Sequence, residues 1–262
     1  TGLGFLGASN SGMARASRLA ARVLLRGPLD GRKTRFLLEN PDDARLLGFG
    51  AENDPRIVIV GGAGVDPKHY SPSPMPPMPP LKIAIVARMV WSKGIDIAVE
   101  AARRARAAGA PVELSLYGEP DPTNPKAFPQ ETLARWGREP GIAWHGRTSD
   151  AATVWQAHHV CCLPSRGGEG LPRTLLEGAS CGRAILTSDV PGCRALVRDG
   201  IEGILVPAGD AEALSRAMVS LASDLERVWR LGEAARERVL GGFTERHVID
   251  KVAALYRELS AQ

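Results

Sequence analysis

The sequence predicts an α/β protein whose larger part is a parallel β-sheet with helices on both faces. After residue 81, short strand-like segments alternate with helix-like segments, and the strand-like ones are almost entirely apolar. This pattern is typical of parallel strands buried on both faces. A shorter α/β region comes first, separated by Ser71–Pro80, in which six of ten residues are proline. Such a segment cannot join a helix or an interior strand, so it predicts an extended linker.

The chain begins with a basic region. Residues 1–38 carry an excess of six positive charges, whereas the net charge of all 262 residues is +4. Residues 10–26 are expected to form a helix that ends before Gly27–Pro28. Its arginines recur every three or four residues along one face: Arg15, Arg18, Arg22 and Arg26. Such a helix can lie on an anionic membrane surface, or it can present an ordinary solvated face, and both interpretations stay open.

The rest of the first region predicts two strands. Arg35–Asp43 has the pattern of a strand that runs into a helix, with Asn40 or Asp42 as the N-cap. Ile57–Val60 is a second apolar strand. The opening string Gly2–Gly7 matches the dinucleotide fingerprint G-x-G-x-x-G, but no strand precedes it and no β-α-β unit follows it on schedule. It therefore does not predict an NAD site.

The region after the linker supplies the main sheet. Its expected strands are residues 82–87, 112–117, 142–145, 159–164, 184–187 and 204–206. Its expected helices are residues 94–108, 151–158, 172–180, 210–222, 225–240 and 244–260.

The cysteines, the histidines and the lengths of the apolar runs limit which classes of protein the chain can belong to. The four cysteines, Cys161, Cys162, Cys181 and Cys193, form no C-x-x-C pair, which fits buried thiols in a reducing cytosol. Cys193 is expected in a loop. His158 and His159 are adjacent and have no partner at metal-ligand spacing, so we expect structural histidines and no metal site. No apolar run approaches the roughly 18 residues that cross a bilayer, which predicts a soluble chain.

The centre of the pattern is a strand, a glycine-rich loop and a helix. The loop and helix read Ser165-Arg-Gly-Gly-Glu169-Gly-Leu-Pro-Arg-Thr-Leu-Leu-Glu177. Pro172 is suited to the first helical position. The start of a helix offers free N–H groups and the positive end of its dipole, which favours an anion such as phosphate. Glu169 is expected in the mouth of the loop and Glu177 about two turns into the helix.

A second group of charges follows the first strand of the main sheet. Arg88 and Lys93 are five residues apart in the loop after residue 87. Ligands of parallel sheets bind beyond the carboxyl ends of the strands, where two cations can flank a diphosphate and neutralise the charge on a leaving group. The alternative is two solvated surface cations.

Taken together, these motifs resemble family 4 retaining glycosyltransferases of the GT-B fold. The resemblance rests on Glu169-Gly-Leu-Pro-Arg-Thr-Leu-Leu-Glu177, on Asp189–Arg194, on Gly203–Pro207 and on the Gly-Val-Asp turn at residues 64–66. It is strongest to bacterial members that extend lipid-linked or surface polysaccharides. It implies a partial N-terminal, acceptor-side Rossmann-like domain at residues 1–70, a linker at 71–80 and a complete C-terminal donor domain at 81–242. Residues 243–262 would form a helix that crosses back to the first domain.

The resemblance also implies roles for single residues. Arg88 and Lys93 would hold the donor diphosphate, Glu169 would orient the transferred sugar, and Glu177 would accept hydrogen bonds from the ribose. The amides of Arg173 and Thr174 would complete a phosphate cradle. The remaining expected donor-binding residues are Gly118, Arg147 at the base pocket, Gly170 and Leu171. No cofactor or metal is expected, because the nucleotide sugar is a substrate.

The implied function is a retaining transfer of a hexose or N-acetylhexosamine from a nucleotide-diphospho-sugar, expected to be a UDP-sugar, to a lipid-linked or polysaccharide acceptor. The implied place is the cytoplasm, with peripheral contact to the inner face of the plasma membrane, and no nucleic acid is involved. The family's phosphate loop near its native N-terminus is missing, so we expect an N-terminally truncated chain that need not be active alone. Two alternatives stay open: a sugar-nucleotide epimerase of the same fold, and a non-catalytic domain that binds nucleotide sugars.

Overall fold

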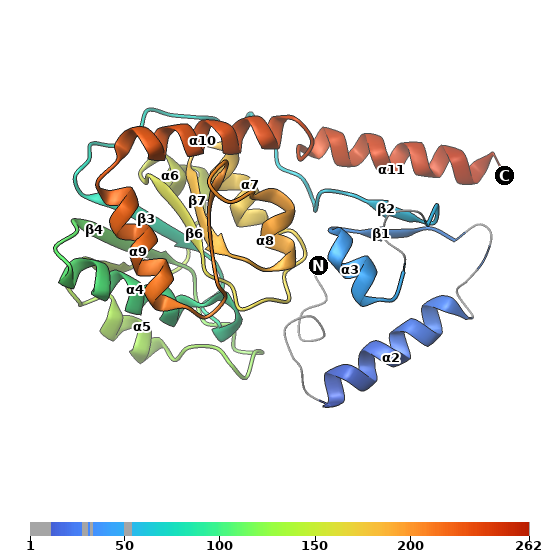
Figure 1. The fold of residues 1–262 in the computed structure, drawn as a ribbon, viewed down its shortest axis with the longest axis horizontal. Helices are drawn as coiled ribbons and strands as arrows, with labels where there is room; N and C mark the ends of the chain where they lie inside the picture. Colours follow the sequence, from blue (N-terminus) through green and yellow to red (C-terminus); the bar gives the residue numbers. More distant parts are fainter. Residues whose placement is uncertain (1–11, 28–30, 32–33, 50–53, 262) are drawn as a thin grey trace.

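The computed structural model describes residues 12–27, 31, 34–49 and 54–261. Its main body is one six-stranded sheet in the order β5-β4-β3-β6-β7-β8, in which every neighbouring pair is parallel (Figure 1). The strands are β3 (Leu81–Val86), β4 (Val112–Tyr117), β5 (Ile142–Trp144), β6 (Val160–Leu163), β7 (Ala184–Ser188) and β8 (Gly203–Val206). The predicted parallel α/β fold is confirmed, and each predicted strand lies within two residues of its expected bounds.

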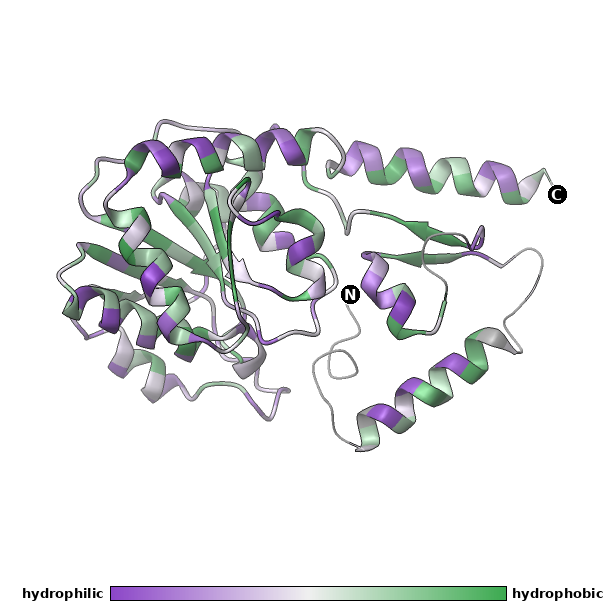
Figure 2. Ribbon diagram, viewed as in Figure 1, coloured by the Kyte–Doolittle hydropathy of each residue, from purple (hydrophilic) through white to green (hydrophobic). Residues whose placement is uncertain are grey.

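Helices cover both faces of this sheet. They are α4 (Ile95–Ala107), α5 (Gln130–Trp136), α6 (Ala151–Gln156), α7 (Arg173–Ser180), α8 (Pro191–Leu196), α9 (Ala211–Ala222) and α10 (Leu225–Leu240), with a short 3₁₀ turn η1 (Trp91–Lys93). Alternate side chains of one strand enter two separate cores, as the two-residue period requires. In β3, Ile83 and Ile85 face the core of α4 and α9, whereas Ala84 faces the core of α6 and α7. Figure 2 shows green, hydrophobic strands inside helices with purple outer faces.

The first region forms a smaller unit. It contains α2 (Gly12–Arg26), β1 (Phe36–Leu38), α3 (Pro41–Leu46) and β2 (Ile57–Ile59), and β1 pairs with β2 in parallel. Asn40 caps α3, because its Oδ1 accepts the N–H of Asp43 at 2.8 Å. Of the two predicted caps, Asn40 is therefore the one used.

The last helix reaches this smaller unit. Helix α11 (Glu245–Ser260) continues beyond α10 and lies beside β2 (Figure 1). The Lys251 Nζ donates to the carbonyl of Ile59 at 3.3 Å, and Arg35 forms an ion pair with Glu258. The proline-rich segment is also held in place. Buried Arg183 donates to the carbonyl of Ser73 at 2.9 Å, and Ser180 Oγ donates to the carbonyl of Tyr70 at 2.8 Å.

Three short elements were not predicted. Helices α5 and α8 have only seven and six residues, too few for a helical period to show. The turn η1 is shorter still. Cys193 lies in α8, buried, so the expectation of a loop there was wrong. Pro172 is the N-cap of α7 and Arg173 its first residue, one position later than predicted. The string Gly2–Gly7 lies outside the described residues.

Helix α2 keeps polar and apolar side chains at the surface. Arg15 and Arg22 are exposed, and Arg22 Nε donates to the carbonyl of Leu46 at 3.0 Å. Apolar side chains are exposed on the same helix: Met13, Leu19, Val23 and Leu24. Among the described residues, no helix has the length and apolar character needed to span a bilayer.

The buried histidine at the end of α6 predicts a pH dependence of stability. His158 Nδ1 donates to the carbonyl of Val154 at 2.7 Å, and burial lowers the pKa of His158 to about 4. An unfolded histidine has a pKa of about 6.5, so the unfolded chain binds the extra proton between these values. The contribution of neutral His158 to stability is therefore fully present above pH 6.5 and is lost as the pH drops toward 4. The expected loss at pH 5 is about 2 kcal/mol.

Urea unfolding at pH 7 and pH 5 measures this loss. His158→Gln is expected to reduce the difference between the two pH values, whereas His69→Gln serves as the control, because the side chain of His69 is 55% exposed. Equal losses for wild type and His158→Gln would show that other groups cause the dependence.

Candidate active site

The order of the sheet reverses at one place. Strand β3 is flanked by β4 on one side and by β6 on the other, so the crossover connections leave in opposite directions. Ligands of such sheets bind beyond the carboxyl ends of the strands at this reversal. The loop after β3 carries Arg88 and Lys93, and the loop after β6 carries Glu169. The fold therefore brings two sequence-distant loops to one crevice.

Lys93 and Glu169 form an ion pair across this crevice. The Lys93 Nζ lies 2.8 Å from each carboxylate oxygen of Glu169. The two side chains are only 18% and 12% exposed, so their attraction is screened less than that of a surface pair. The hydroxyl of Ser165 donates to Glu169 Oε1 at 2.8 Å. The crevice thus holds a cation and an anion in fixed positions.

Close packing between the two loops sets this geometry. Gly94 has φ 70°, and a Cβ at that position would lie 1.9 Å from the carbonyl oxygen of Pro164. Only glycine allows the turn into α4 to approach the loop after β6 so closely. Arg166 adds a second link, because its guanidinium makes two 2.8 Å hydrogen bonds to Asp96 and lies over the ring of Trp91.

The start of α7 faces the same crevice without a side-chain cap. Its N-cap is Pro172, which makes no capping hydrogen bond, so the first N–H groups of the helix are available to a ligand. Thr174 adds a hydroxyl, and its Oγ1 is buried without a hydrogen-bond partner. Uncapped N–H groups beside a lysine favour an anionic ligand.

Two adjoining cavities contain most of the predicted site residues. The first, of about 350 Å³, is lined by Arg88, Lys93, Glu169, Gly170, Leu171, Arg173 and Thr174. The second, also of about 350 Å³, is lined by Arg88, Gly118 and Arg147, among others. Val86, Ala87 and Arg88 form the wall that the two cavities share. One elongated ligand could occupy both.

Arg88 is close to Lys93 in sequence but has a different partner. Its Nη1 donates to Asp121 Oδ2 at 2.6 Å, and the side chain is 65% exposed. Hydrogen bonds from Thr123 and Arg88 lower the pKa of Asp121. A ligand phosphate would have to compete with this carboxylate for Arg88.

Glu177 is not among the residues that line the two cavities, but Arg173, which contacts it, lines the first. Glu177 is buried on α7, where Arg173 Nε donates to its carboxylate at 3.0 Å. Tyr70 is its neighbour. Burial raises the pKa of Tyr70 to about 12, and the negative charge of Glu177 adds to the rise. Glu177 is the fifth residue of α7, so it lies just over one turn into the helix, nearer its start than the two turns predicted.

Several polar partners of the site were missed by the sequence analysis. Ser165 lies at the edge of the quoted motif, but its bond to Glu169 could not be inferred from spacing. Asp121 and Tyr70 belong to segments that the motifs do not include. Glu39 comes from the first region and accepts the N–H of Leu171 at 2.8 Å. No group of three or more possible metal ligands lies among the residues that the structure describes.

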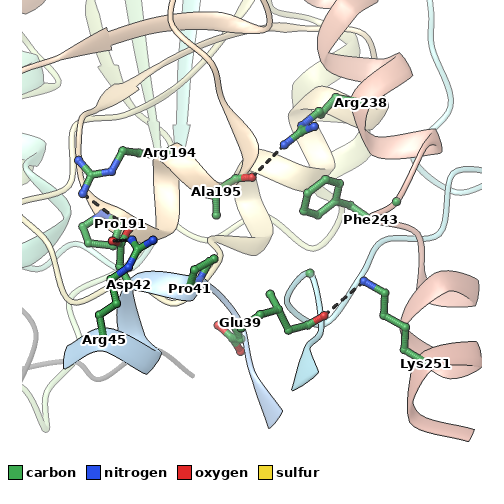
Figure 3. A pocket seen from close by; sticks show the side chains of 13 residues that line it. Glu39, Pro41, Asp42, Arg45, Pro191, Arg194, Ala195, Arg238, Phe243 and Lys251 are labelled. Carbon is green, nitrogen blue, oxygen red and sulfur yellow. Dashed lines mark hydrogen bonds and ion pairs between the residues drawn. The ribbon is translucent and has the colours of Figure 1, made fainter. Parts of the chain in front are cut away.

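A larger cavity lies on the other side of Glu39. It has a volume of about 580 Å³ and is lined by residues of the first region, of α8, α10 and α11, and of the turn between α10 and α11 (Figure 3). Arg45 and Arg194 approach Asp42 there, at 3.0 and 3.7 Å. Arg238 and Lys251 instead donate to backbone carbonyls, those of Ala195 and Ile59 (Figure 3). Cationic groups thus surround this cavity as well.

The fold and the crevice define an α/β protein of GT-B type with a site suited to a phosphate-bearing ligand. The chain belongs to the family "Glycosyl transferases group 1", whose sequence model matches residues 80–224. The matched segment contains every residue of the two smaller cavities except Glu39 and Ala63. The expectation that the chain is a glycosyltransferase of this kind of fold is confirmed.

Similar proteins point the same way. The chain is 31% identical over 194 residues to alpha-maltose-1-phosphate synthase of Mycolicibacterium smegmatis, covering 68% of this chain and 48% of that protein. It is 26% identical over 188 residues to the amylovoran biosynthesis glycosyltransferase AmsK of Erwinia amylovora, covering 69% and 46%. The chain spans about half the length of the first curated relatives it matches.

A solved structure shares the fold. The structure of Alr3699/HepE of Anabaena in complex with UDP and glucose superposes with a TM-score of 0.72 at 17% identity, covering 92% of this chain and 66% of that one.

Proposed function

We propose that this chain carries the donor site of a retaining glycosyltransferase that uses a nucleotide-diphospho-sugar, with UDP as the nucleotide. The observation that supports this best is the crevice itself. It combines the Lys93–Glu169 pair, 2.8 Å apart, with the uncapped start of α7. Membership of the group 1 family and the UDP bound to the related HepE structure support the choice of ligand.

In this proposal the donor occupies both smaller cavities. The base lies beside Gly118 and Arg147, the diphosphate lies between Arg88, Lys93 and the start of α7, and the sugar lies beside Glu169. The nucleotide ribose donates hydrogen bonds to Glu177. This requires the ribose hydroxyls to replace Arg173 as the hydrogen-bond donor to the Glu177 carboxylate. Residues 1–70 form part of an acceptor-side domain, residues 81–242 the donor domain, and residues 243–262 the helix that returns to the first part.

The proposed reaction keeps the configuration of the sugar. The bond between C1 and the diphosphate oxygen breaks, and the acceptor oxygen bonds to C1 on the same face. The acceptor proton passes to the departing diphosphate, so no side chain acts as a dedicated base. Lys93 and Arg88 stabilise the negative charge that builds on the diphosphate. Glu169 orients the sugar through a ring hydroxyl.

We propose a lipid-linked or polysaccharide acceptor. The names of relatives support it, because AmsK is described as acting in amylovoran biosynthesis and a 39% identical segment of 82 residues matches a phosphatidyl-myo-inositol mannosyltransferase of Mycobacterium leprae. The exposed arginines and apolar side chains of α2 are compatible with contact to an anionic membrane surface.

The decisive test is calorimetric titration of the chain with UDP, GDP and ADP. We expect UDP to bind more tightly than GDP or ADP. Glu177→Ala is expected to weaken UDP about ten- to hundredfold, because hydrogen bonds to a charged group contribute about 1.5–3 kcal/mol.

Glu131→Ala is the matched control, since Glu131 is an exposed carboxylate at the start of α5. Equal affinities for the three nucleotides, or no effect of Glu177→Ala, would contradict the assignment of the nucleotide or of Glu177. A chain that binds none of them would contradict the donor site in this chain.

A further inference from the structure

One peptide group of the donor loop is held at both of its polar atoms by the first region. The N–H of Leu171 donates to Glu39 Oε2 at 2.8 Å, and the carbonyl of Gly170 accepts from Asn40 Nδ2 at 3.4 Å. These two atoms belong to the same peptide bond. Glu39 and Asn40 are also neighbours in sequence, at the step from β1 into α3. Two consecutive side chains therefore bind one peptide group about 130 residues away in the sequence, and these two hydrogen bonds form the grip on the Gly170–Leu171 peptide.

The fold fixes both side chains for this contact. Asn40 is fully buried and caps α3, so its Oδ1 accepts the N–H of Asp43, while its Nδ2 donates to Asp43 Oδ2 at 2.9 Å and to the carbonyl of Gly170 at 3.4 Å. Glu39 precedes the cap and lines the cavity that contains Lys93 and Glu169. Neither side chain is an ordinary surface group.

Two glycines pack closely against the same loop. A Cβ at Gly192 of α8 would lie 1.7 Å from the carbonyl oxygen of Gly170. A Cβ at Gly62 would lie 3.1 Å from the Cβ of Leu171. The peptide is thus packed against Gly192 of α8 and Gly62, and it is gripped by Glu39 and Asn40, so its rotation is restricted.

We propose that Glu39 and Asn40 are positioning residues for donor binding, acting through the Gly170–Leu171 peptide. This inference rests on the proposed function. Glu169 precedes the gripped peptide and is paired with Lys93, so rotation of the peptide would move the Glu169 carboxylate relative to the sugar. Binding energy depends on such preorganisation. The first region thereby sets the sugar end of the donor site, although its residues come from outside the sheet that carries the site.

The first test measures the grip without any nucleotide. An amide held by a hydrogen bond exchanges its proton slowly, because it must open first. Hydrogen exchange of the segment containing Leu171, followed by mass spectrometry, is expected to be at least about tenfold faster at the Leu171 amide in Glu39→Ala. Glu39→Gln keeps an acceptor oxygen and is expected to restore slow exchange. Glu131→Ala is the control on α5. Unchanged exchange in Glu39→Ala would overturn the grip.

The second test measures its consequence for the ligand. Glu39→Ala is expected to weaken UDP-glucose about three- to tenfold while leaving UDP within twofold, because the gripped peptide adjoins Glu169 at the proposed sugar end. Glu39→Gln is expected to regain most of the affinity. Faster exchange with unchanged UDP-glucose affinity would overturn the positioning role. Tighter UDP-glucose binding in Glu39→Ala would also overturn it, and would instead identify Glu39 as a competitor of the donor for the Leu171 amide.

Asn40 provides an independent arm. Asn40→Ser keeps a good N-cap for α3 but is too short to reach Gly170. If both residues act on one peptide, the losses of UDP-glucose affinity in Glu39→Ala and Asn40→Ser are coupled, and the double variant loses less than the product of the two. Independent losses would contradict a shared target. If wild type binds no nucleotide sugar but its exchange depends on Glu39, the proposed function fails while the grip itself stands.

Discussion

Lys93→Ala is expected to lower kcat/KM for the proposed sugar transfer by about 10²- to 10³-fold. The ammonium is paired with the Glu169 carboxylate and lines the same cavity as the uncapped start of α7, where the donor diphosphate is proposed to lie. Charge on the leaving diphosphate grows as the C1–O bond breaks, so the loss should fall mainly on kcat. Initial rates at varied donor concentration separate kcat from KM.

Two further variants make this result specific. Arg88→Ala is expected to lower kcat/KM by less, roughly tenfold, because the Arg88 guanidinium is more exposed and is already paired with Asp121. Lys126→Ala is the matched control, since Lys126 lies over the ring of Trp91 at 4.3 Å and lines neither of the two smaller cavities. The assignment of Lys93 is wrong if Lys93→Ala stays within a few-fold of wild type, or if Lys126→Ala loses as much.

The sequence identified most of the residues around the crevice but not how they pair. Lys93 and Glu169 were both expected at the donor, yet their ion pair joins residues 76 positions apart. No local spacing encodes such a contact, because it depends on the reversal of strand order between β3 and β6. Arg88 illustrates the converse. It is near Lys93 in sequence, but its side chain turns to Asp121.

Secondary structure was predictable where segments are long and strongly patterned. Apolar strands such as β4 and β7 and the helices α9, α10 and α11 lie close to their expected ranges, because burial on a face leaves a clear period. Helix α8 begins with Pro191-Gly192, which reads as a turn in isolation, and it is stabilised by packing against the Glu169–Gly170 loop. For Asn40, the capping of α3 was predicted, but the hydrogen bond from its side chain to the carbonyl of Gly170 was not.

Gly94→Ala is expected to lower the free energy of unfolding by about 2–5 kcal/mol. The left-handed conformation at φ 70° destabilises a residue that has a Cβ by about 1–2 kcal/mol. The Cβ would also lie 1.9 Å from the carbonyl oxygen of Pro164, so the turn into α4 must move away from the loop after β6, at a further cost typical of overpacking, about 1–3 kcal/mol. Urea unfolding followed by circular dichroism measures the change.

The other end of α4 supplies the control. Gly109 has a similar φ of 86°, but a Cβ there would have no neighbour within 4 Å. Gly109→Ala should therefore lower the free energy of unfolding only by the conformational term, about 1–2 kcal/mol. The difference between the two variants isolates the contact between the loops. Because that contact brings Lys93 to Glu169, Gly94→Ala should also weaken UDP binding under conditions where it remains folded, whereas Gly109→Ala should not. Equal destabilisation by the two variants would mean that the contact between Gly94 and Pro164 does not hold the crevice together.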